Sequence, residues 1–187
     1  MDKNKIIANE LLKVVGGKPK VTRYWDSTNK KSIDVFFAKD QPFNGIITCA
    51  SIGLSDHNIG LKSSDKKLRV ELIGACNDNH PDFPNLLSTA AFEIIDKGSC
   101  NYGTILPRVI ELYYPDAIMK HIYLMSPFLW DKLASIELSD LKVAWLLMVP
   151  ISDGEMKYAM QNGVDELETL FEKEDINIFD LSRKSTI

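Results

Sequence analysis

The sequence predicts an α+β fold in which a mixed, largely antiparallel sheet is flanked by helices. Four strand candidates follow one another between Val21 and Cys76 with short links, which favours an antiparallel meander. An unbroken apolar run from Val143 to Val149 predicts a further strand that is covered on both faces. Apolar residues at helical spacing over 83–95 predict a helix that lies flat on the sheet.

The first part of the chain reads as a helix followed by strands. A helix is predicted over Asp2–Val15, because its apolar residues form one stripe and a glycine pair follows it. Strands are predicted over Val21–Trp25 and Ile33–Phe37, joined by a polar turn in which Asn29 can take a positive φ angle. The other two strands of the meander are expected over Ile46–Leu54 and Leu68–Cys76.

The middle of the chain alternates between loops and short elements. The polar segment Asn77–Pro81 predicts a loop, and proline then opens the long helix, which ends at Gly98. Glycine, asparagine and proline signals over Ser99–Pro107 predict a second loop. Short strands are expected beyond it over Val109–Tyr113, Ile122–Met125 and Ser135–Leu138.

The stretch Val143–Glu155 combines a buried strand, a stop and a helix start. Pro150 has no N–H to donate, so regular strand pairing is expected to fail there. Ser152 and Glu155 have the spacing of a capping box, in which each side chain binds a backbone amide at the start of a helix. A helix is therefore predicted over Glu155–Gln161, ending at an Asn-Gly break.

The last predicted helix, Asp165–Lys173, is amphipathic and acidic. Its buried side is expected to hold Val164, Leu167, Leu170 and Phe171. Its carboxylates are expected to face away from the protein or to flank the helix, at Glu166, Glu168, Glu172 and Glu174. Residues 150–187 hold nine acidic and four basic side chains, so this end carries the negative charge of the chain.

Length and composition predict a single domain over residues 1–187. The chain has 187 residues, of which 45% are hydrophobic, and this is enough for a substantial core. A net charge of −4 argues against nucleic acid or an anionic membrane as a direct partner. Three cysteines without a C-x-x-C pair, no signal-peptide pattern and no membrane-length apolar run predict a cytoplasmic protein.

The strongest candidates for catalysis lie at the end of the third predicted strand. Asp56 and His57 share a loop, and Cys49 precedes them by eight residues. A Cys-His pair can form a nucleophile only when the two side chains are within hydrogen-bond reach and the thiol is activated. Cys49 lies in an apolar strand, which favours a buried structural thiol, so no catalytic residue is assigned.

The loop Asn77–Asp82 is the one candidate metal site. Asp78, His80 and Asp82 stand two residues apart, but the glycine and distal glutamate of a calcium loop are missing. The alternative is a polar loop that leads into the helix, with Asp82 near the helix N-terminus. His121 has no evident partner and is expected to be structural. No metal or other cofactor is therefore assigned, and no phosphate-binding motif occurs.

Several separated motifs together resemble the suppressor of fused family in its short bacterial form. They begin with Thr48-x-x-Ser51-Ile52-Gly53-Leu54-Ser55 and Arg69-Val70-Glu71-Leu72-Ile73, followed by the helix Leu86–Ile95 and Pro107. They continue with Val149-Pro150-Ile151, Glu155, Gly163-Val164-Asp165-Glu166-Leu167 and Asp180-x-x-Arg183-x-Ser185. The segments Asn77–Asp82 and Tyr113–Lys120 depart from the family pattern.

The resemblance implies an α/β sandwich without enzymatic activity. It is greatest to Bacillus members that act as immunity proteins beside LXG-type toxins, whose toxic domains are commonly nucleases. On this basis we expect an antitoxin that neutralises a cognate polymorphic toxin, an LXG-type nuclease that cleaves DNA, through a stoichiometric protein complex. Neither direct nucleic-acid binding nor a small-molecule ligand is expected. An acidic inhibitor would complement a nuclease surface that must attract phosphate.

The candidate partner-binding residues are acidic side chains after the capping box: Asp153, Asp165, Glu166, Glu168 and Glu172. Two alternatives remain open at this point. One is a regulatory module that binds a host protein, as the large animal members of the family do. The other is a hydrolase that uses His57 and Asp56.

Overall fold

The computed structural model describes residues 2–63 and 65–187. Within these residues, nine strands form one mixed sheet, and four α-helices flank it. The strands are β1 (Lys20–Trp25), β2 (Ser32–Lys39), β3 (Ile46–Ile52), β4 (Lys62–Ser63), β5 (Lys66–Asn77), β6 (Ile105–Leu106), β7 (His121–Met125), β8 (Ile136–Glu137) and β9 (Leu141–Ile151). The helices are α1 (Lys3–Val15), α2 (Phe83–Lys97), α3 (Asp153–Asn162) and α4 (Val164–Lys173), with a short 3-10 turn over Leu54–Asp56.

The sheet has the order β1-β2-β3-β5-β9-β7-β6, with β4 paired to β5 and β8 paired to β9. The first four strands in this order are antiparallel neighbours, which confirms the predicted meander. The β5–β9 pair is parallel, and the remaining pairs are antiparallel. The predicted α+β class with a mixed, largely antiparallel sheet is therefore confirmed.

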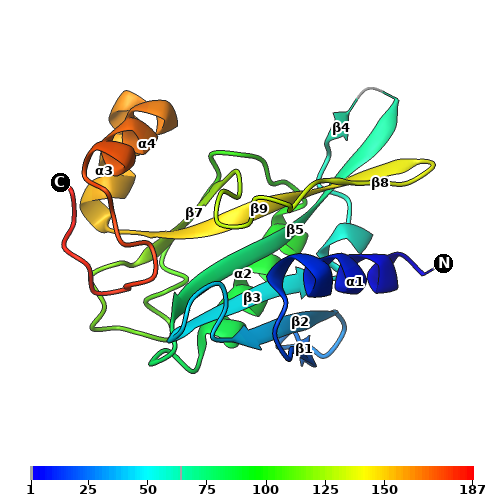
Figure 1. Ribbon diagram of the computed structural model, residues 1–187. Coiled ribbons are helices and arrows are strands. Elements are labelled where there is room, and N and C mark those ends of the chain that lie inside the picture. The colour runs from blue at the N-terminus through cyan, green and yellow to red at the C-terminus, as the bar shows by residue number, and fades with distance from the viewer. Residues whose placement is uncertain (1, 64) are drawn as a thin grey trace.

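Two apolar cores lie on opposite faces of the sheet. One packs α2 against the sheet, with Leu86, Leu87 and Ile94 fully buried. The other lies beneath α1, α3 and α4, which share the opposite face (Figure 1). β9 contributes to both cores, because its alternate side chains point to opposite faces of the sheet. This explains why its sequence shows no polar alternation.

Local sequence signals determine how several elements begin and end. Asn29 takes a φ of 56° in the β1–β2 hairpin, as predicted. The side chain of Asp2 accepts the amide of Asn4 and caps α1. Gly74 of β5 lets α2 approach the sheet closely, since a Cβ there would lie 3.1 Å from the ring of Phe83.

The prediction that regular pairing fails at Pro150 is wrong. β9 continues to Ile151, and Pro150 lies opposite Ile122 of β7 in the ladder. The register of β9 with its other neighbour, β5, ends at Leu147, so no strand needs an N–H from Pro150 on that side. The Pro150 carbonyl instead accepts a bond from the side chain of Arg183.

The predicted strand Val109–Tyr113 is also wrong, because this segment forms a series of turns. Arg108 takes a φ of 59°, which breaks the extended chain just before the segment. Val109 and Ile110 are nevertheless fully buried in the core beside α2. Their apolar character therefore reflects burial rather than strand pairing. The predicted loop Ser99–Pro107 contains the short strand β6.

Candidate functional site

The start of α3 is built around the buried carboxylate of Glu155. The Ser152 side chain accepts the Glu155 amide at 3.1 Å, and the Glu155 carboxylate accepts the Ser152 amide at 2.9 Å. This confirms the predicted capping box. The same carboxylate accepts the amide and the hydroxyl of Thr186, close to the end of the chain. One side chain therefore holds both the helix start and the C-terminal segment.

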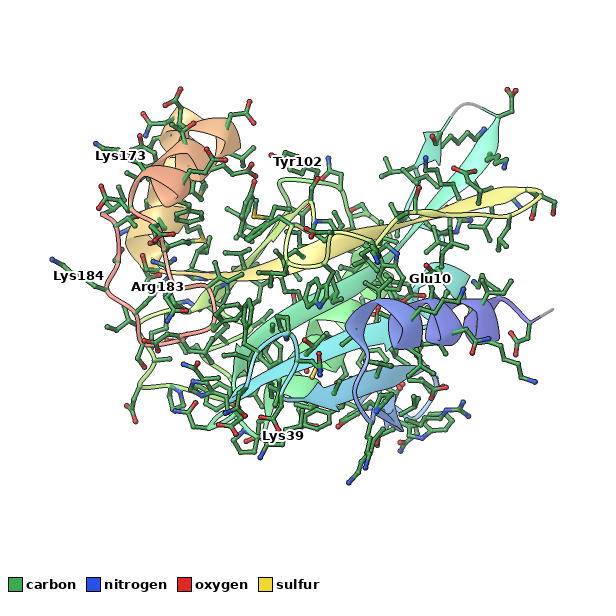
Figure 2. All side chains as sticks on the ribbon, in the orientation of Figure 1. Glu10, Lys39, Tyr102, Lys173, Arg183 and Lys184 are labelled. Atoms are coloured by element: carbon green, nitrogen blue, oxygen red, sulfur yellow. The ribbon has the colours of Figure 1, made fainter. Side chains whose placement is uncertain are left out.

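Arg183 completes this cluster from the C-terminal segment. Its guanidinium donates two bonds to Glu155, at 2.7 and 2.8 Å, and a third to the carbonyl of Pro150. Its Cζ atom lies 5.4 Å from the ring centroid of Phe171 in α4, within cation–π range. Figure 2 shows Arg183 among the side chains beneath α3, whereas the neighbouring Lys184 points outward.

The pKa of Glu155 reflects two opposing effects. Burial would raise it, but the hydrogen bonds from Arg183 and the Ser152 amide outweigh burial and hold the pKa below its ordinary value. The carboxylate is therefore charged at neutral pH and paired with a charged guanidinium. Through Arg183, this pair connects the start of α3 to the end of β9 and to Phe171 of α4.

The acidic side chains of α4 divide into two sets. Asp165, Glu166 and Glu172 are exposed, as predicted for partner-binding residues. Asp165 and Glu166 also lie in the first helical turn, where negative charge is favourable to the helix dipole. Leu167 and Phe171 are buried on the opposite side, which confirms the predicted apolar stripe at these two positions. α4 therefore presents carboxylates on its outer face.

Glu168 is half-buried and flanks the buried side of α4, the second of the two predicted positions for the α4 carboxylates. Its Oε1 atom accepts hydrogen bonds from the hydroxyls of Tyr102 and Tyr123. Tyr123 of β7 is fully buried, and burial together with the bond to Glu168 raises the pKa of this phenol. The tyrosine therefore remains a donor, and it anchors α4 to the sheet. The sequence gives no sign of this pair because 45 residues separate its members.

Asp153 belongs to a different cluster from the α4 carboxylates. Its carboxylate lies 3.0 Å from Nε2 of His121 and 3.8 Å from the guanidinium of Arg108. The other ring nitrogen of His121 accepts the backbone amide of Arg108 at 2.8 Å. Both nitrogens are thus engaged, which leaves neither for a substrate. The structure confirms a buried histidine, with the partner Asp153 that the sequence did not reveal.

The residues considered for catalysis, Cys49, Asp56 and His57, lie in different surroundings. The carboxylate of Asp56 lies 2.5 Å from Lys3 and accepts a bond from Asn4, both in α1. Cys49 is fully buried in the core beside α2, and burial raises the pKa of its thiol. Burial also lowers the pKa of His57. These environments favour neither a reactive thiolate nor an Asp-His pair.

The side chains of the loop 77–82 also point to separate partners. Asp78 pairs with Lys39, Asp82 accepts a bond from Asn85, and the His80 ring packs edge-on against Tyr114. In residues 2–63 and 65–187, no group of three or more His, Cys, Asp or Glu side chains is arranged to hold a metal ion. Asp82 stands at the N-cap of α2, which fits the alternative reading of this loop.

A buried glutamate that the sequence analysis did not single out connects two of the family motifs. Glu71 accepts the Ser51 hydroxyl at 2.5 Å and the amides of Gly53 and Ser55 at 3.0 Å. Gly53 takes a φ of 108° in this turn, where other residues would be strained. Glu71 is fully buried, and burial raises its pKa against the effect of these bonds. The two motifs therefore form one structural junction.

Comparisons with known proteins agree with this arrangement. Residues 29–184 match the family model described as suppressor of fused protein (SUFU). The chain belongs to the suppressor of fused family. It is 42% identical over 186 residues to a Bacillus subtilis (strain 168) protein named "Immunity protein YqcF", covering 98% of this chain and 97% of that protein. No helix in the described part of the chain has the length and apolar character needed to cross a membrane.

Solved structures of other suppressor of fused proteins share the fold. A SUFU homologue from Neisseria gonorrhoeae FA 1090 superposes with a TM-score of 0.74 at 17% identity, covering 100% of this chain and 98% of that one. A structure of the Sufu–Fu complex gives 0.71 at 13% identity, with coverages of 97% and 91%. Drosophila Suppressor of Fused gives 0.66 at 14% identity, and this chain spans 50% of that chain.

The family motifs of this chain have structural roles. Glu71 ties the turn at Gly53 to β5, and Arg183 ties the C-terminal segment to Glu155. The charged side chains of Glu71, Glu155 and Arg183 are all buried, so none of them is exposed at the surface. The residues that distinguish one suppressor of fused protein's partner from another's are therefore to be sought on the surface that this scaffold positions.

Proposed function

We propose that this chain is an immunity protein that binds a cognate toxin polypeptide and neutralises it by forming a stoichiometric complex. The toxin is proposed to be an LXG-type nuclease, and the complex is proposed to form in the cytoplasm of the producing bacterium. The observation that carries the proposal is the 42% identity, over 98% of this chain, to a relative named "Immunity protein YqcF".

The charge of the outer face of α4 supports a basic partner. Asp165, Glu166 and Glu172 are exposed there, and they lie on a rigidly anchored helix. A nuclease must attract the phosphate backbone of its substrate and therefore carries a basic surface around its active site. Opposite charges steer two proteins together and favour the correct orientation, so this face is suited to meet such a surface.

The surroundings of the catalytic candidates support binding rather than catalysis. Asp56 is paired with Lys3 of α1, and His121 has both ring nitrogens engaged. Cys49 is buried in the core. A protein that neutralises by covering the toxin requires a stable surface and needs no reactive group.

The test is co-expression of this chain with each LXG-type nuclease domain encoded in the same genome, in a bacterial host that carries neither gene. We expect one such domain to prevent growth when expressed alone and to be tolerated when this chain is present. The two polypeptides should then purify together at equal molar amounts. Continued killing in the presence of this chain by every such domain would overturn the proposal.

A further inference from the structure

A surface pocket beside α4 has the form of a docking site. It has a volume of about 580 Å³ and lies between α4, the segment 125–129 that begins at the last residue of β7, and the segment 175–179. Val149 of β9 and Phe171 of α4 contribute apolar surface to it. We call this the α4 pocket. Asp175, with a φ of 46°, reverses the chain after α4 and brings the segment 175–179 back along the pocket.

Aromatic side chains line the α4 pocket, and one of them is exposed to solvent. Phe128 lines it and remains 53% exposed to solvent. Phe179, in the segment on the opposite side, also lines the pocket. Its ring packs edge-on against Phe43, which is itself 60% exposed. Large aromatic side chains left in water are costly to the isolated protein and are enriched at the centres of protein interfaces. The pocket therefore favours an apolar group from a partner.

Carboxylates line this apolar surface on the side formed by α4 and the residue at position 175. Glu168, Glu172 and Asp175 line the α4 pocket, and among the described lining residues none is lysine or arginine. Glu168 is held by Tyr102 and Tyr123, so its position is fixed before a partner arrives. An apolar group flanked by arginine or lysine would satisfy the apolar surface and the carboxylates together.

The α4 wall of the pocket is held by buried contacts within the chain. Phe171 packs beneath the guanidinium of Arg183, which is itself fixed by Glu155. A preformed pocket loses little conformational entropy on binding, which favours tight association. Another pocket, of about 660 Å³ beside α2, is lined by side chains of both charge signs, with Lys31 paired to Asp96. The lining of that pocket therefore does not favour a partner of one charge sign.

We infer that the α4 pocket receives a large apolar side chain of the toxin, flanked in the toxin sequence by arginine or lysine. This inference rests on the proposed function and goes beyond it, because it places the centre of the interface in the pocket rather than on the outer acidic face alone. Phe128 supplies the apolar contact, and Glu172 and Asp175 contact the basic flanks.

The test measures binding of the full-length chain to the nuclease domain identified by co-expression, after that domain has been made catalytically inactive. Phe128→Ala should weaken binding by about tenfold or more, mainly through faster dissociation, as expected for a central aromatic contact. Leu112→Ala is the matched control, because Leu112 is 67% exposed and lies outside the pocket. Thermal unfolding should show that both variants keep the wild-type fold.

A second variant tests the charge requirement. Glu172→Lys should slow association, and the loss should diminish as salt is added. If wild-type chain binds and protects but Phe128→Ala and Glu172→Lys both behave like Leu112→Ala, the pocket inference fails while the proposed function stands. If the wild-type chain neither binds nor protects against any of the nuclease domains, the proposed function fails and this inference with it.

Discussion

Arg183 and Glu155 form a buried two-point ion pair that joins the C-terminal segment to the start of α3. Both side chains are almost fully buried, and their atoms approach to 2.7 Å. The pair also connects the sheet to α4, because Arg183 bonds to the Pro150 carbonyl and packs on Phe171. The proposed binding surface on α4 is therefore connected to the sheet through a buried ion pair.

Removing Arg183 should destabilise the protein strongly. Arg183→Met leaves Glu155 charged and buried, so the free energy of unfolding should fall by about 3–5 kcal/mol. Urea denaturation at pH 7 measures this change. Lys184→Met is the control, because Lys184 is exposed and should change stability by less than about 0.5 kcal/mol. Equal stability of the two variants would contradict the role assigned to the pair.

The contributions of the buried Glu155 and Glu71 to folding stability should change with pH in opposite directions. The pKa of Glu155 is lowered in the folded state, so its stabilisation is present above the unfolded pKa and lost as the pH falls through the folded pKa. The pKa of Glu71 is raised by burial, so its contribution is present at low pH and lost as the pH rises.

Urea denaturation between pH 3 and pH 7 tests these signs. The stability deficit of Glu155→Gln relative to wild type should shrink as the pH is lowered, because wild type then loses the charged carboxylate. Glu71→Gln should become more favourable relative to wild type as the pH is raised, because glutamine avoids a buried charge. Differences from wild type that move in the same direction for both variants would contradict the assigned environments.

The bond between Tyr123 and Glu168 should contribute more stability than the bond between Tyr102 and Glu168. Tyr123→Phe removes a buried donor to a carboxylate, and we expect a loss of about 1.5–3 kcal/mol in the free energy of unfolding. Tyr102 is 42% exposed, so water can replace its bond and Tyr102→Phe should cost less. Urea denaturation compares the two variants, and a larger loss for Tyr102→Phe would exclude Tyr123 as the main anchor of α4.

Charge reversal on the outer face of α4 should slow association with the toxin. Replacing Asp165, Glu166 and Glu172 by lysine should reduce the association rate constant about tenfold at low salt, and less at high salt. Surface plasmon resonance at several salt concentrations measures this effect. The matched control carries the same charge change at exposed positions on other elements: Asp96, Asp116 and Asp140. Equal slowing by both sets would show a net-charge effect without a defined surface.

Elements with strong local signals were predictable from the sequence. The apolar stripe of α1 and its end at the glycine pair, the hairpin at Asn29 and the capping box of Glu155 depend on neighbouring residues, and each is confirmed. The run Val143–Val149 was correctly interpreted as a strand covered on both faces. That residues 1–187 form one domain remains a prediction.

Features determined by distant contacts were not predictable. Pro150 continues a strand because the pairing of β9 with β5 already ends at Leu147, and Val109–Tyr113 is apolar because it is buried without pairing. The position of Glu168 in α4 is outside the apolar stripe, yet its carboxylate accepts hydrogen bonds from tyrosines in other parts of the chain. Of the acidic residues predicted to bind a partner, Asp165, Glu166 and Glu172 are exposed on α4. Their role in binding remains a prediction.

The central claim is that this chain neutralises a toxin by covering it in a stoichiometric complex. The most direct measurement titrates the purified chain into a fixed concentration of the active nuclease domain, well above the dissociation constant, and records DNA cleavage. We expect a linear loss of cleavage that is complete at an equimolar ratio, and cleavage should return when the complex is separated in denaturant and the nuclease is refolded. Complete loss of cleavage at a small fraction of an equivalent would indicate that each molecule of this chain inactivates many toxin molecules, and would contradict the account.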